Sequence, residues 1–337
     1  MIDILVAGGG PAGLAAAIRA ATAGLEAVVI EPRHLPVDKA CGEGIMPSGV
    51  AALRALGVNP AGSTLRGIRY VEGTRRAEAA FRGSPGLGVR RTELHTALHR
   101  RATELGVRVV TGRAGEVRQD GRSVTTAGLT ARWLVAADGL HSPLRRSLGL
   151  ERPCTSQRRY GLRRHYRIAP WTDFVEVHWS REGEAYVTPV GEELVGVAVL
   201  SRHRRSHEQH LTAFPALART LRGLEAGPVR GAGPLRRSVS APGAGRVLLA
   251  GDAAGYVDAL TGEGIALAVA TASAAVDCLA AGRPEAYPAR WARLTRRHRL
   301  LTGALLGAVG HPATARLIVP AAHRLPALFG AAVRALQ

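Results

Sequence analysis

The stretch Ile2–Glu31, IDILVAGGGPAGLAAAIRAATAGLEAVVIE, decides the fold. Its apolar start at residues 2–7 is typical of a strand buried in a parallel sheet. The alanine-rich segment that stops at Gly24 predicts a helix, and Ala27–Ile30 predicts a second strand. Strand, helix and strand together form a βαβ unit, which indicates a parallel sheet with helices packed on its faces.

The glycines of this unit follow the order GxGxxG and predict a dinucleotide site. Gly8 permits the tight turn, Gly10 lets the backbone approach a pyrophosphate, and Gly13 lets helix and strand pack closely. Glu31 stands eighteen residues beyond Gly13, where a carboxylate can accept hydrogen bonds from a ribose hydroxyl. An acid at this position favours an unphosphorylated ribose, as in FAD or NAD.

Two later segments repeat the pattern of a buried strand followed by glycine and aspartate. Trp133–Ala137 precedes Asp138-Gly139, and Arg246–Ala250 precedes Gly251-Asp252. Together with the dinucleotide fingerprint, these motifs resemble the flavoprotein monooxygenase superfamily, which includes para-hydroxybenzoate hydroxylase and the geranylgeranyl reductases. The order and spacing of the three motifs agree with that superfamily across most of the chain.

The resemblance implies a fold and a cofactor. The implied fold class is α/β, with a discontinuous Rossmann-type FAD-binding domain, an inserted antiparallel β-sheet substrate domain and a C-terminal helical tail. FAD rather than NAD would occupy the first site, with Asp252 at the ribityl and pyrophosphate region, Arg91 against the flavin and residues 261–265 beside the isoalloxazine ring. The expected cofactor-binding residues are Gly8, Gly10, Pro11, Ala12, Gly13, Glu31, Arg33, Lys39, Cys41, Gly42, Arg91, Val117, Asp138, Gly139, Gly251, Asp252, Gly262, Gly264 and Ile265.

The loop Asp38–Pro47 contains the only lysine of the chain, Lys39. Arginine supplies the other 44 of the 45 basic residues, so a lysine here indicates a compact charge at a phosphate or flavin edge, with an accidental codon as the alternative. The loop resembles the Cys-Gly-containing loop of geranylgeranyl reductases, as does Gly262-Glu263-Gly264, whereas Asp258-Ala259 departs from the Asp-Pro common in that branch. Cys41 is interpreted as a packing residue rather than a nucleophile, because no base stands near it.

Residues 1–70, 91–155 and 236–285 are assigned to the FAD-binding domain, residues 71–90 and 156–235 to the substrate-binding sheet, and residues 286–337 to C-terminal helices. Four strand patterns predict the sheet, at residues 160–168, 174–180, 184–190 and 194–200. Period two places Arg164 and Tyr166 on one face of the first strand and His165 on the other, and the sequence leaves open which face lines the pocket. We take Cys41, Glu43, Arg164 and Tyr166 as pocket candidates, and interpret His165 and His178 as surface or cross-strand residues.

From Glu285 onward the chain reads as helical, with arginines beside an apolar pattern at helical spacing formed by Trp291, Leu294, His298, Leu301 and Leu305. We interpret this segment as a helix docked on the flavin domain. A basic amphipathic contact with a membrane or an acidic carrier protein is the alternative. The prolines expected to break the tail into short helices are Pro312, Pro320 and Pro326.

Composition limits the partners. The chain has 337 residues and a formal net charge of +19, but its arginines are spread along the sequence and only 4% of residues are aromatic, which argues against nucleic acid. Three cysteines far apart argue against a disulfide scaffold or a cysteine zinc site, and no metal site is expected. No uncharged apolar run reaches the roughly 18 residues of a membrane span, so we expect a cytoplasmic protein, with peripheral membrane contact left open.

The resemblance implies an FAD-dependent oxidoreductase and leaves three functions open. The first is a monooxygenase of secondary metabolism, in which a flavin C4a-hydroperoxide inserts oxygen into a hydrophobic or aromatic small molecule. The second is a flavin-dependent reductase of isoprenoid double bonds, and the third is a basic binding protein for an acidic carrier protein or nucleic acid. NAD(P)H is the expected electron donor. It would dock transiently or act through a partner flavin reductase, because a second dinucleotide fingerprint is not evident.

Overall fold

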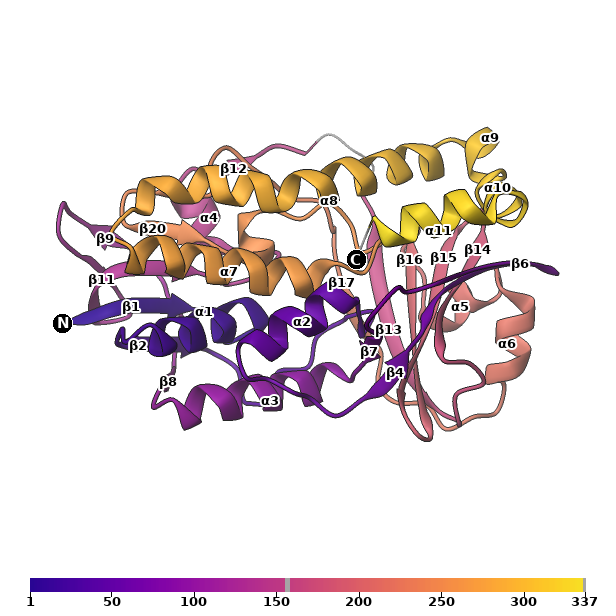
Figure 1. Ribbon diagram of the computed structural model, residues 1–337, viewed down its shortest axis with the longest axis horizontal. Helices are drawn as coiled ribbons and strands as arrows, with labels where there is room; N and C mark the ends of the chain where they lie inside the picture. The colour runs from indigo at the N-terminus through magenta and orange to yellow at the C-terminus, as the bar shows by residue number, and fades with distance from the viewer. Residues whose placement is uncertain (155–157, 336–337) are drawn as a thin grey trace.

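The computed structural model describes residues 1–154 and 158–335 and confirms the α/β class. A mainly parallel sheet lies at one end of an elongated molecule and a mainly antiparallel sheet at the other (Figure 1). The first sheet has the order β19-β20-β11-β1-β2-β8. Its parallel strands are β1 (Ile2–Ala7), β2 (Ala27–Glu31), β8 (Arg108–Thr111), β11 (Leu129–Ala136) and β20 (Val247–Leu249). Antiparallel additions are β9 (Arg118–Gln119), β10 (Val124–Thr126) and β19 (Gly243–Ala244).

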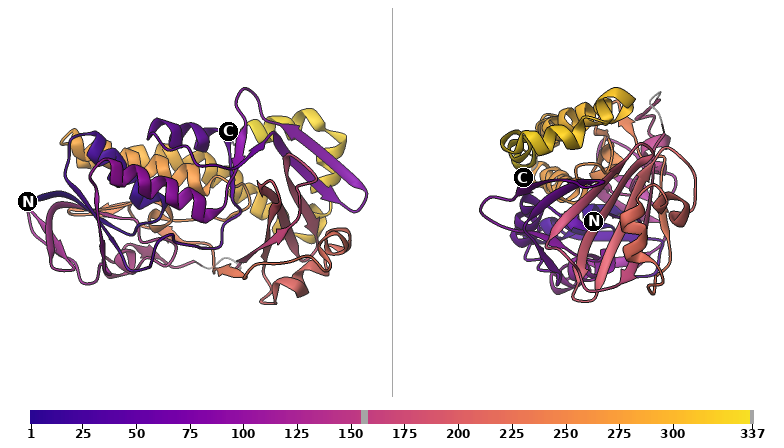
Figure 2. Two further views of the ribbon diagram at one scale, coloured as in Figure 1. Left: turned by 90° about the horizontal axis from the view of Figure 1, so that it is seen from below. Right: turned by 90° about the vertical axis from the view of Figure 1, so that its right-hand side faces the viewer.

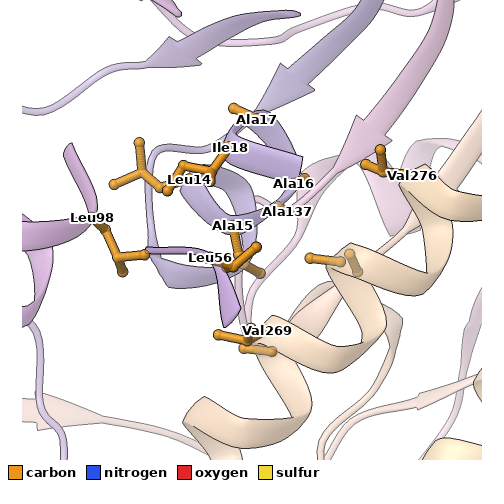
Figure 3. Close-up of a cluster of buried hydrophobic side chains, with 14 of the residues drawn as sticks. Leu14, Ala15, Ala16, Ala17, Ile18, Leu56, Leu98, Ala137, Val269 and Val276 are labelled. Carbon is orange, nitrogen blue, oxygen red and sulfur yellow. The ribbon is translucent and has the colours of Figure 1, made fainter. Parts of the chain in front are cut away.

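One face of this sheet is covered by α1 (Pro11–Thr22), α2 (Pro47–Ala55), α3 (Arg91–Glu104) and α7 (Gly264–Ala280). Alanines dominate α1 and α7, and these small side chains let the two helices pack against each other closely. Figure 3 shows Leu14 and Ile18 of α1 in one buried cluster with Leu98 of α3 and Val269 of α7. The short helix α4 (Pro143–Ser147) packs on the opposite face through Leu144.

The second sheet has the order β17-β13-β16-β15-β14-β5-β6. Its strands are β5 (Gly67–Glu72), β6 (Arg75–Ala80), β13 (Tyr160–Arg167), β14 (Phe174–Ser180), β15 (Gly183–Gly191), β16 (Leu194–Ser201) and β17 (Arg230–Ala232). The four strands predicted between residues 160 and 200 are confirmed as antiparallel neighbours. The expected boundary after residue 70 falls inside β5, which pairs in parallel with β14, and the expected boundary at 155/156 lies outside the described residues.

The two faces of the second sheet have different cover. Helices α5 (His207–Leu211) and α6 (Pro215–Leu221) pack on the face that carries Tyr166 and Val197. The other face carries Val177 and Leu200 and belongs to a cluster shared with the C-terminal helices. Small pairings complete the fold, namely β3 (Gly44–Ile45) and β4 (Ser63–Leu65) with β7 (Gly86–Gly88), and β12 (Glu151–Arg152) with β18 (Ser238–Val239).

The tail runs as α8 (Tyr287–Gly310), α9 (Pro312–Ala315), α10 (Ile318–Arg324) and α11 (Pro326–Arg334), after the short 3₁₀ turn Pro284–Ala286. Figure 2 shows these helices on the outside of the molecule, spanning both halves. Pro312 and Pro326 each begin a helix. The prediction for Pro320 is wrong: it lies in the first turn of α10, where a missing N–H removes no hydrogen bond. Within the described residues, no helix combines the length and apolar character needed to cross a bilayer.

Gly13 is the glycine of the first βαβ unit at which a side chain would collide most severely with backbone. A Cβ built there would lie 1.7 Å from the Gly8 carbonyl oxygen, whereas a Cβ at Gly10 would meet only Arg91 Nη2, at 3.7 Å. We expect Gly13→Ala to lower the free energy of unfolding by roughly 3 kcal/mol, because backbone must move to relieve the overlap. The matched variant Gly10→Ala should cost less than about 1 kcal/mol. Urea unfolding followed by circular dichroism measures both, and equal stability of the two variants would contradict the packing described.

Candidate functional site

A cavity of about 410 Å³ lies where the two halves meet. Its polar end is lined by the glycine turn after β1, by the loop that carries the only lysine, and by the segment after β20; the residues include Gly10, Arg33, Lys39, Arg91, Gly139 and Asp252. Its apolar end is lined by one face of the second sheet and by α11, through Ile68, Tyr70, Val175, Val177, Tyr186, Leu200 and Val333. One continuous space therefore connects a charged pocket to an apolar one.

Glu31 organises the glycine turn at the polar end. Its side chain is buried, and Oε2 accepts a hydrogen bond from the Gly9 N–H at 2.7 Å. Arg33 donates through Nε to Oε1 at 2.6 Å and through Nη2 to Oε2 at 2.9 Å. Burial raises the pKa of Glu31, but the hydrogen bonds from Arg33 and Gly9 outweigh it, so the pKa lies below its usual value. Glu31 is therefore a fixed anion that holds the turn in place.

Lys39, Arg33 and Arg91 all line the polar end. The Lys39 Nζ lies 3.3 Å from the position of a Cβ at Gly139, and Arg91 Nε is buried without a hydrogen-bond partner among the described residues. Burial and then repulsion from Arg33 and Arg91 lower the pKa of Lys39. Three cations around one pocket, one of them with an unsatisfied donor, fit a diphosphate, which would supply the missing charge and acceptors.

Asp252 faces this cluster from the 3₁₀ turn Gly251–Ala254. Burial raises the pKa of Asp252, while the nearby charges of Lys39 and Arg91 act in the opposite direction. Gly251, at φ +59°, donates its N–H to Thr271 Oγ1 at 3.0 Å and so anchors the turn to α7. A carboxylate held here beside the three cations fits the ribityl hydroxyls of FAD, which are hydrogen-bond donors.

Glu43 is the point at which the cofactor loop meets the second sheet. It has φ +60°, a conformation that costs a non-glycine residue roughly 1 kcal/mol, and its side chain is 1% exposed. Oε1 accepts a hydrogen bond from the Arg91 N–H at 2.8 Å, and Oε2 accepts one from His165 Nε2 at 2.7 Å. A Cβ at Gly196 would lie 2.8 Å from Oε2, so glycine on β16 leaves the space that this carboxylate fills.

The proton on His165 can be placed from its neighbours. Arg163 Nη1 lies 3.1 Å from His165 Nδ1, and a guanidinium only donates, so Nδ1 is the acceptor. The imidazole is therefore neutral and carries its proton on Nε2, which donates to Glu43. Arg163 also forms an ion pair with Asp38 and donates to the Lys39 carbonyl at 3.2 Å. The network fixes loop residues 38–43 against β13.

Cys41 lines the cavity beside this network. Burial raises the pKa of its thiol, and its Sγ accepts a hydrogen bond from the Glu43 N–H at 3.4 Å. A neutral, half-buried thiol is a poor nucleophile. The interpretation of Cys41 as a packing residue agrees with this environment.

The turn before α7 borders the middle of the cavity. Gly262 has φ +70°, and Gly264, Ile265 and Thr261 line the space, so the N-terminus of the long helix α7 faces it. Glu263 Oε2 accepts a hydrogen bond from His298 Nδ1 of α8 at 2.8 Å. The tail therefore holds this turn, a contact that helical periodicity could not reveal because it joins residues 35 positions apart.

Asp258, the residue before the departure from Asp-Pro, is buried in a charged cluster. Arg159 Nη2 donates to Glu184 Oε2 at 2.5 Å, and Arg159 Nε lies 3.2 Å from Asp258 Oδ2, all within the protein interior. Burial raises the pKa of Asp258 to about 6. Tyr186 donates its hydroxyl hydrogen to the Leu260 carbonyl at 3.1 Å, which anchors the segment two residues beyond Asp258 to β15.

Two pocket candidates lie elsewhere. Arg164 donates to the Gly227 carbonyl at 2.8 Å and pairs with Glu208, and Tyr166 contacts His207 under α5. The prediction for Arg164 and Tyr166 is therefore wrong, because the opposite face of β13, with Arg163, turns toward the cavity. Val117 packs against the first sheet and does not line the cavity, so its predicted contact with adenine stays a prediction.

The remaining predicted residues divide into two groups. Gly8 and Gly13 shape the turn and helix contact of the first βαβ unit without lining the cavity. Asp138 lines the cavity and also accepts the Leu144 N–H at 3.1 Å, and burial raises its pKa. The other predicted residues that line the cavity are Pro11, Ala12, Gly42 and Gly139.

His95 makes the stability of the site dependent on pH. It is fully buried, Nε2 donates to the Gly9 carbonyl at 2.9 Å, and burial lowers its pKa to about 4. Between this pKa and the unfolded value of about 6.5, the unfolded chain binds more protons, so stability falls as the pH falls. His95 alone should remove about 2 kcal/mol of unfolding free energy between about pH 7 and pH 5.

The variant His95→Gln retains an N–H donor but does not titrate, so its stability should fall less over this range. Denaturant unfolding at both pH values measures how much unfolding free energy each protein loses as the pH falls. Titrating groups that the wild type and the variant share cancel when these losses are compared. A wild-type slope in His95→Gln would refute the assignment of a buried neutral imidazole.

Comparison with known proteins places this geometry in a family. The profile of the FAD binding domain matches residues 1–290. Menaquinone reductase of Mycobacterium tuberculosis is 33% identical over 315 residues, with 82% of this chain and 76% of that protein covered. Digeranylgeranylglycerophospholipid reductase 1 of Methanopyrus kandleri is 28% identical, with 78% and 76% covered.

A solved structure shares the fold over nearly the whole chain. The p-nitrophenol 4-monooxygenase of Pseudomonas putida superposes with a TM-score of 0.81 at 20% identity, with 99% of this chain and 98% of that chain covered. At this identity the likeness concerns the fold. The profile match over residues 1–290 and the identity to menaquinone reductase go further, and they show that this chain belongs to the FAD binding domain family and is an FAD-dependent oxidoreductase.

Proposed function

We propose that the chain is a flavin-dependent reductase of isoprenoid double bonds in a lipid-like substrate, with NAD(P)H or a partner reductase as the electron donor. The observation that carries the proposal is the apolar end of the cavity, where Val175, Val177, Leu200 and Val333 replace the polar lining of the cofactor end. An apolar pocket of this kind favours a hydrocarbon chain, because binding removes apolar surface from water without leaving polar groups unpaired.

The relatives support a reductase over a monooxygenase. Menaquinone and digeranylgeranylglycerophospholipid, the compounds named for two relatives, share a polyisoprenoid chain. The p-nitrophenol 4-monooxygenase shares only the fold with this chain. Oxygen insertion is thus the second candidate function, and the two differ in whether the product gains hydrogen or oxygen.

Reduction of a carbon–carbon double bond requires two electrons and two protons, and the double bond becomes a single bond. Reduced FAD, when bound, would supply a hydride, which carries both electrons and one proton; the second proton would come from solvent, and the oxidised FAD would then be reduced again by the donor. The chain holds the reacting partners and excludes water. Glu43, His165 and Arg163 fix the loop on one side of the cavity, and Tyr186 fixes residue 260 on the other.

The decisive experiment uses the FAD-loaded protein, reduced chemically in the absence of oxygen and mixed with geranylgeranyl diphosphate, in which the carbon–carbon double bonds are the groups that a reduced flavin can hydrogenate. We expect the absorbance band of oxidised flavin to return as substrate is added, with a product that has gained two hydrogens by mass spectrometry. In air with isotopically labelled oxygen, the product should contain no label. A labelled product formed only in air would instead establish the monooxygenase.

Ala198 offers a variant that separates substrate binding from cofactor binding. It lines the apolar end from β16, and Ala198→Phe should fill that space and lower substrate turnover at least about tenfold while FAD stays bound. Ala213→Phe, beside α5 on the opposite side of the second sheet, is the matched control and should leave turnover unchanged. Unaltered turnover in Ala198→Phe with a stable fold would remove the apolar end as the substrate site.

Lys39 gives a test of the cofactor end. Lys39→Met should weaken FAD binding about tenfold, because a charge-assisted contact to phosphate is lost. It should also reduce the dependence of FAD affinity on salt concentration. Lys39→Arg keeps the charge and should recover most of the affinity, and fluorescence titration of the apoprotein measures all three proteins. Wild-type affinity in Lys39→Met would show that the only lysine has no role in the diphosphate pocket.

A further inference from the structure

The tail has an extreme charge balance. Residues 286–337 contain no aspartate or glutamate, but eight arginines, which are Arg290, Arg293, Arg296, Arg297, Arg299, Arg316, Arg324 and Arg334. Arg290 pairs with Asp277 of α7. Within the described part of the chain, no acidic side chain pairs with Arg316 or Arg324, and both are exposed. This segment therefore carries a positive charge that its own neighbours do not balance.

The same segment exposes large apolar side chains. Among the described residues, five of the nine exposed large hydrophobic side chains lie in the tail. Leu317 is 61% exposed, Leu325 is 53% exposed and Leu328 is 65% exposed. Each of the first two leucines directly follows an exposed arginine, at Arg316 and Arg324. We call Arg316, Leu317, Arg324, Leu325 and Leu328 together the tail surface.

Helix α11 is apolar on both of its sides. Its inner side buries Phe329 and Val333, with the Phe329 ring 4.6 Å from the ring of Tyr70. Its exposed side carries Leu328 and three alanines, at positions 327, 331 and 332. A helix at the surface of a soluble protein normally turns polar residues outward, and an apolar outer side flanked by arginines is typical of a helix lying at a bilayer interface.

We propose that the tail surface binds the surface of an anionic lipid bilayer. Arg316 and Arg324 would contact lipid headgroups, while Leu317, Leu325 and Leu328 would enter the boundary of the acyl chains. A second copy of the chain fits this surface less well, because a symmetric contact would place identical unbalanced arginines opposite each other on molecules of net charge +19. An anionic bilayer offers negatively charged headgroups to the arginines and an apolar interior to the leucines.

Helix α11, which carries part of the tail surface, also lines the cavity. Val333, on the inner side of α11, lines the apolar end of the cavity, and His323 of α10 donates to the Arg76 carbonyl on β6 at 2.7 Å. The helix that faces the bilayer would thus also form the cavity wall. The bilayer contact depends only on the residues of the tail surface and not on which reaction the cavity performs.

Sedimentation with lipid vesicles tests the proposal with the FAD-loaded full chain. We expect binding to mixed phosphatidylcholine and phosphatidylglycerol vesicles, weaker binding to phosphatidylcholine alone, and release by added salt. Removing both charges in Arg316→Gln with Arg324→Gln should lower the partition coefficient about twenty-fivefold, at about fivefold per arginine. Leu325→Ser with Leu328→Ser should lower it at least about tenfold, whereas Leu328→Trp should preserve binding.

The control is Arg118→Gln with Arg122→Gln, at the hairpin of β9 and β10, at the opposite end of the molecule from α10 and α11, which should bind as the wild type does. The amount of bound flavin and the melting temperature identify a misfolded variant. If the leucine variant misfolds, the double arginine variant still tests the proposal, because both arginines are exposed. Equal binding by the wild type and both tail variants would overturn the proposal. So would a lack of vesicle binding combined with a dimer that Leu325→Ser and Leu328→Ser dissociate.

Discussion

The buried carboxylate of Glu43 is the interaction on which the arrangement of the two halves depends. It accepts one hydrogen bond from the start of α3 and one from His165 on β13, and so ties the flavin-binding half to the second sheet. The residue has a left-handed backbone conformation, which is retained because the surrounding contacts over-determine it. The contact helps to fix the shape of the cavity, since the polar and apolar ends belong to different sheets, and Arg163 with Asp38 and Tyr186 with the Leu260 carbonyl add further links between them.

Charge has two distinct roles in this arginine-rich chain. At the polar end of the cavity, Lys39, Arg33 and Arg91 surround a space that fits a diphosphate, and the anion Glu31 holds the adjacent turn. In the tail, Arg316 and Arg324, which have no acidic partner among the described residues, lie beside exposed leucines. The net charge of +19 therefore becomes informative only when the positions of the charged residues in the fold are known. A cluster around a cavity indicates a small anion, and a cluster beside leucines indicates an extended surface.

The sequence predicts the fold well because its main signals are local. The glycine turn after β1, the strands between residues 160 and 200, and the start of α3 at Arg91 depend on neighbours within a few positions. The pairing of β5 with β14 joins residues more than a hundred positions apart, and no periodic pattern in the sequence predicts it. For the same reason, a division of the chain into domains by sequence alone cuts through β5.

The residues of the site likewise fall into those that local motifs predict and those that only tertiary contacts place. The cofactor motifs with Gly10, Lys39 and Asp252 reach one cavity, as their positions at strand ends imply. The pocket face of β13 was not predictable, because period two offers two equivalent faces and only the partner Glu43 decides between them. The hold of His298 on the turn at Glu263 likewise arises from tertiary packing. Gly196 could have been a signal, since a glycine inside a strand indicates close approach of another group.

A crystal structure of the FAD complex is the most direct test of the central claim, that one cavity joins a flavin site to an apolar substrate site. We expect the diphosphate beside Lys39 and Arg91, the ribityl chain beside Asp252, and the isoalloxazine ring between the loop at Cys41 and the turn at Gly262. We also expect the space toward Val177, Leu200 and Val333 to stay open next to the ring. A flavin ring outside the cavity, or a ring that fills the apolar end completely, would contradict this claim.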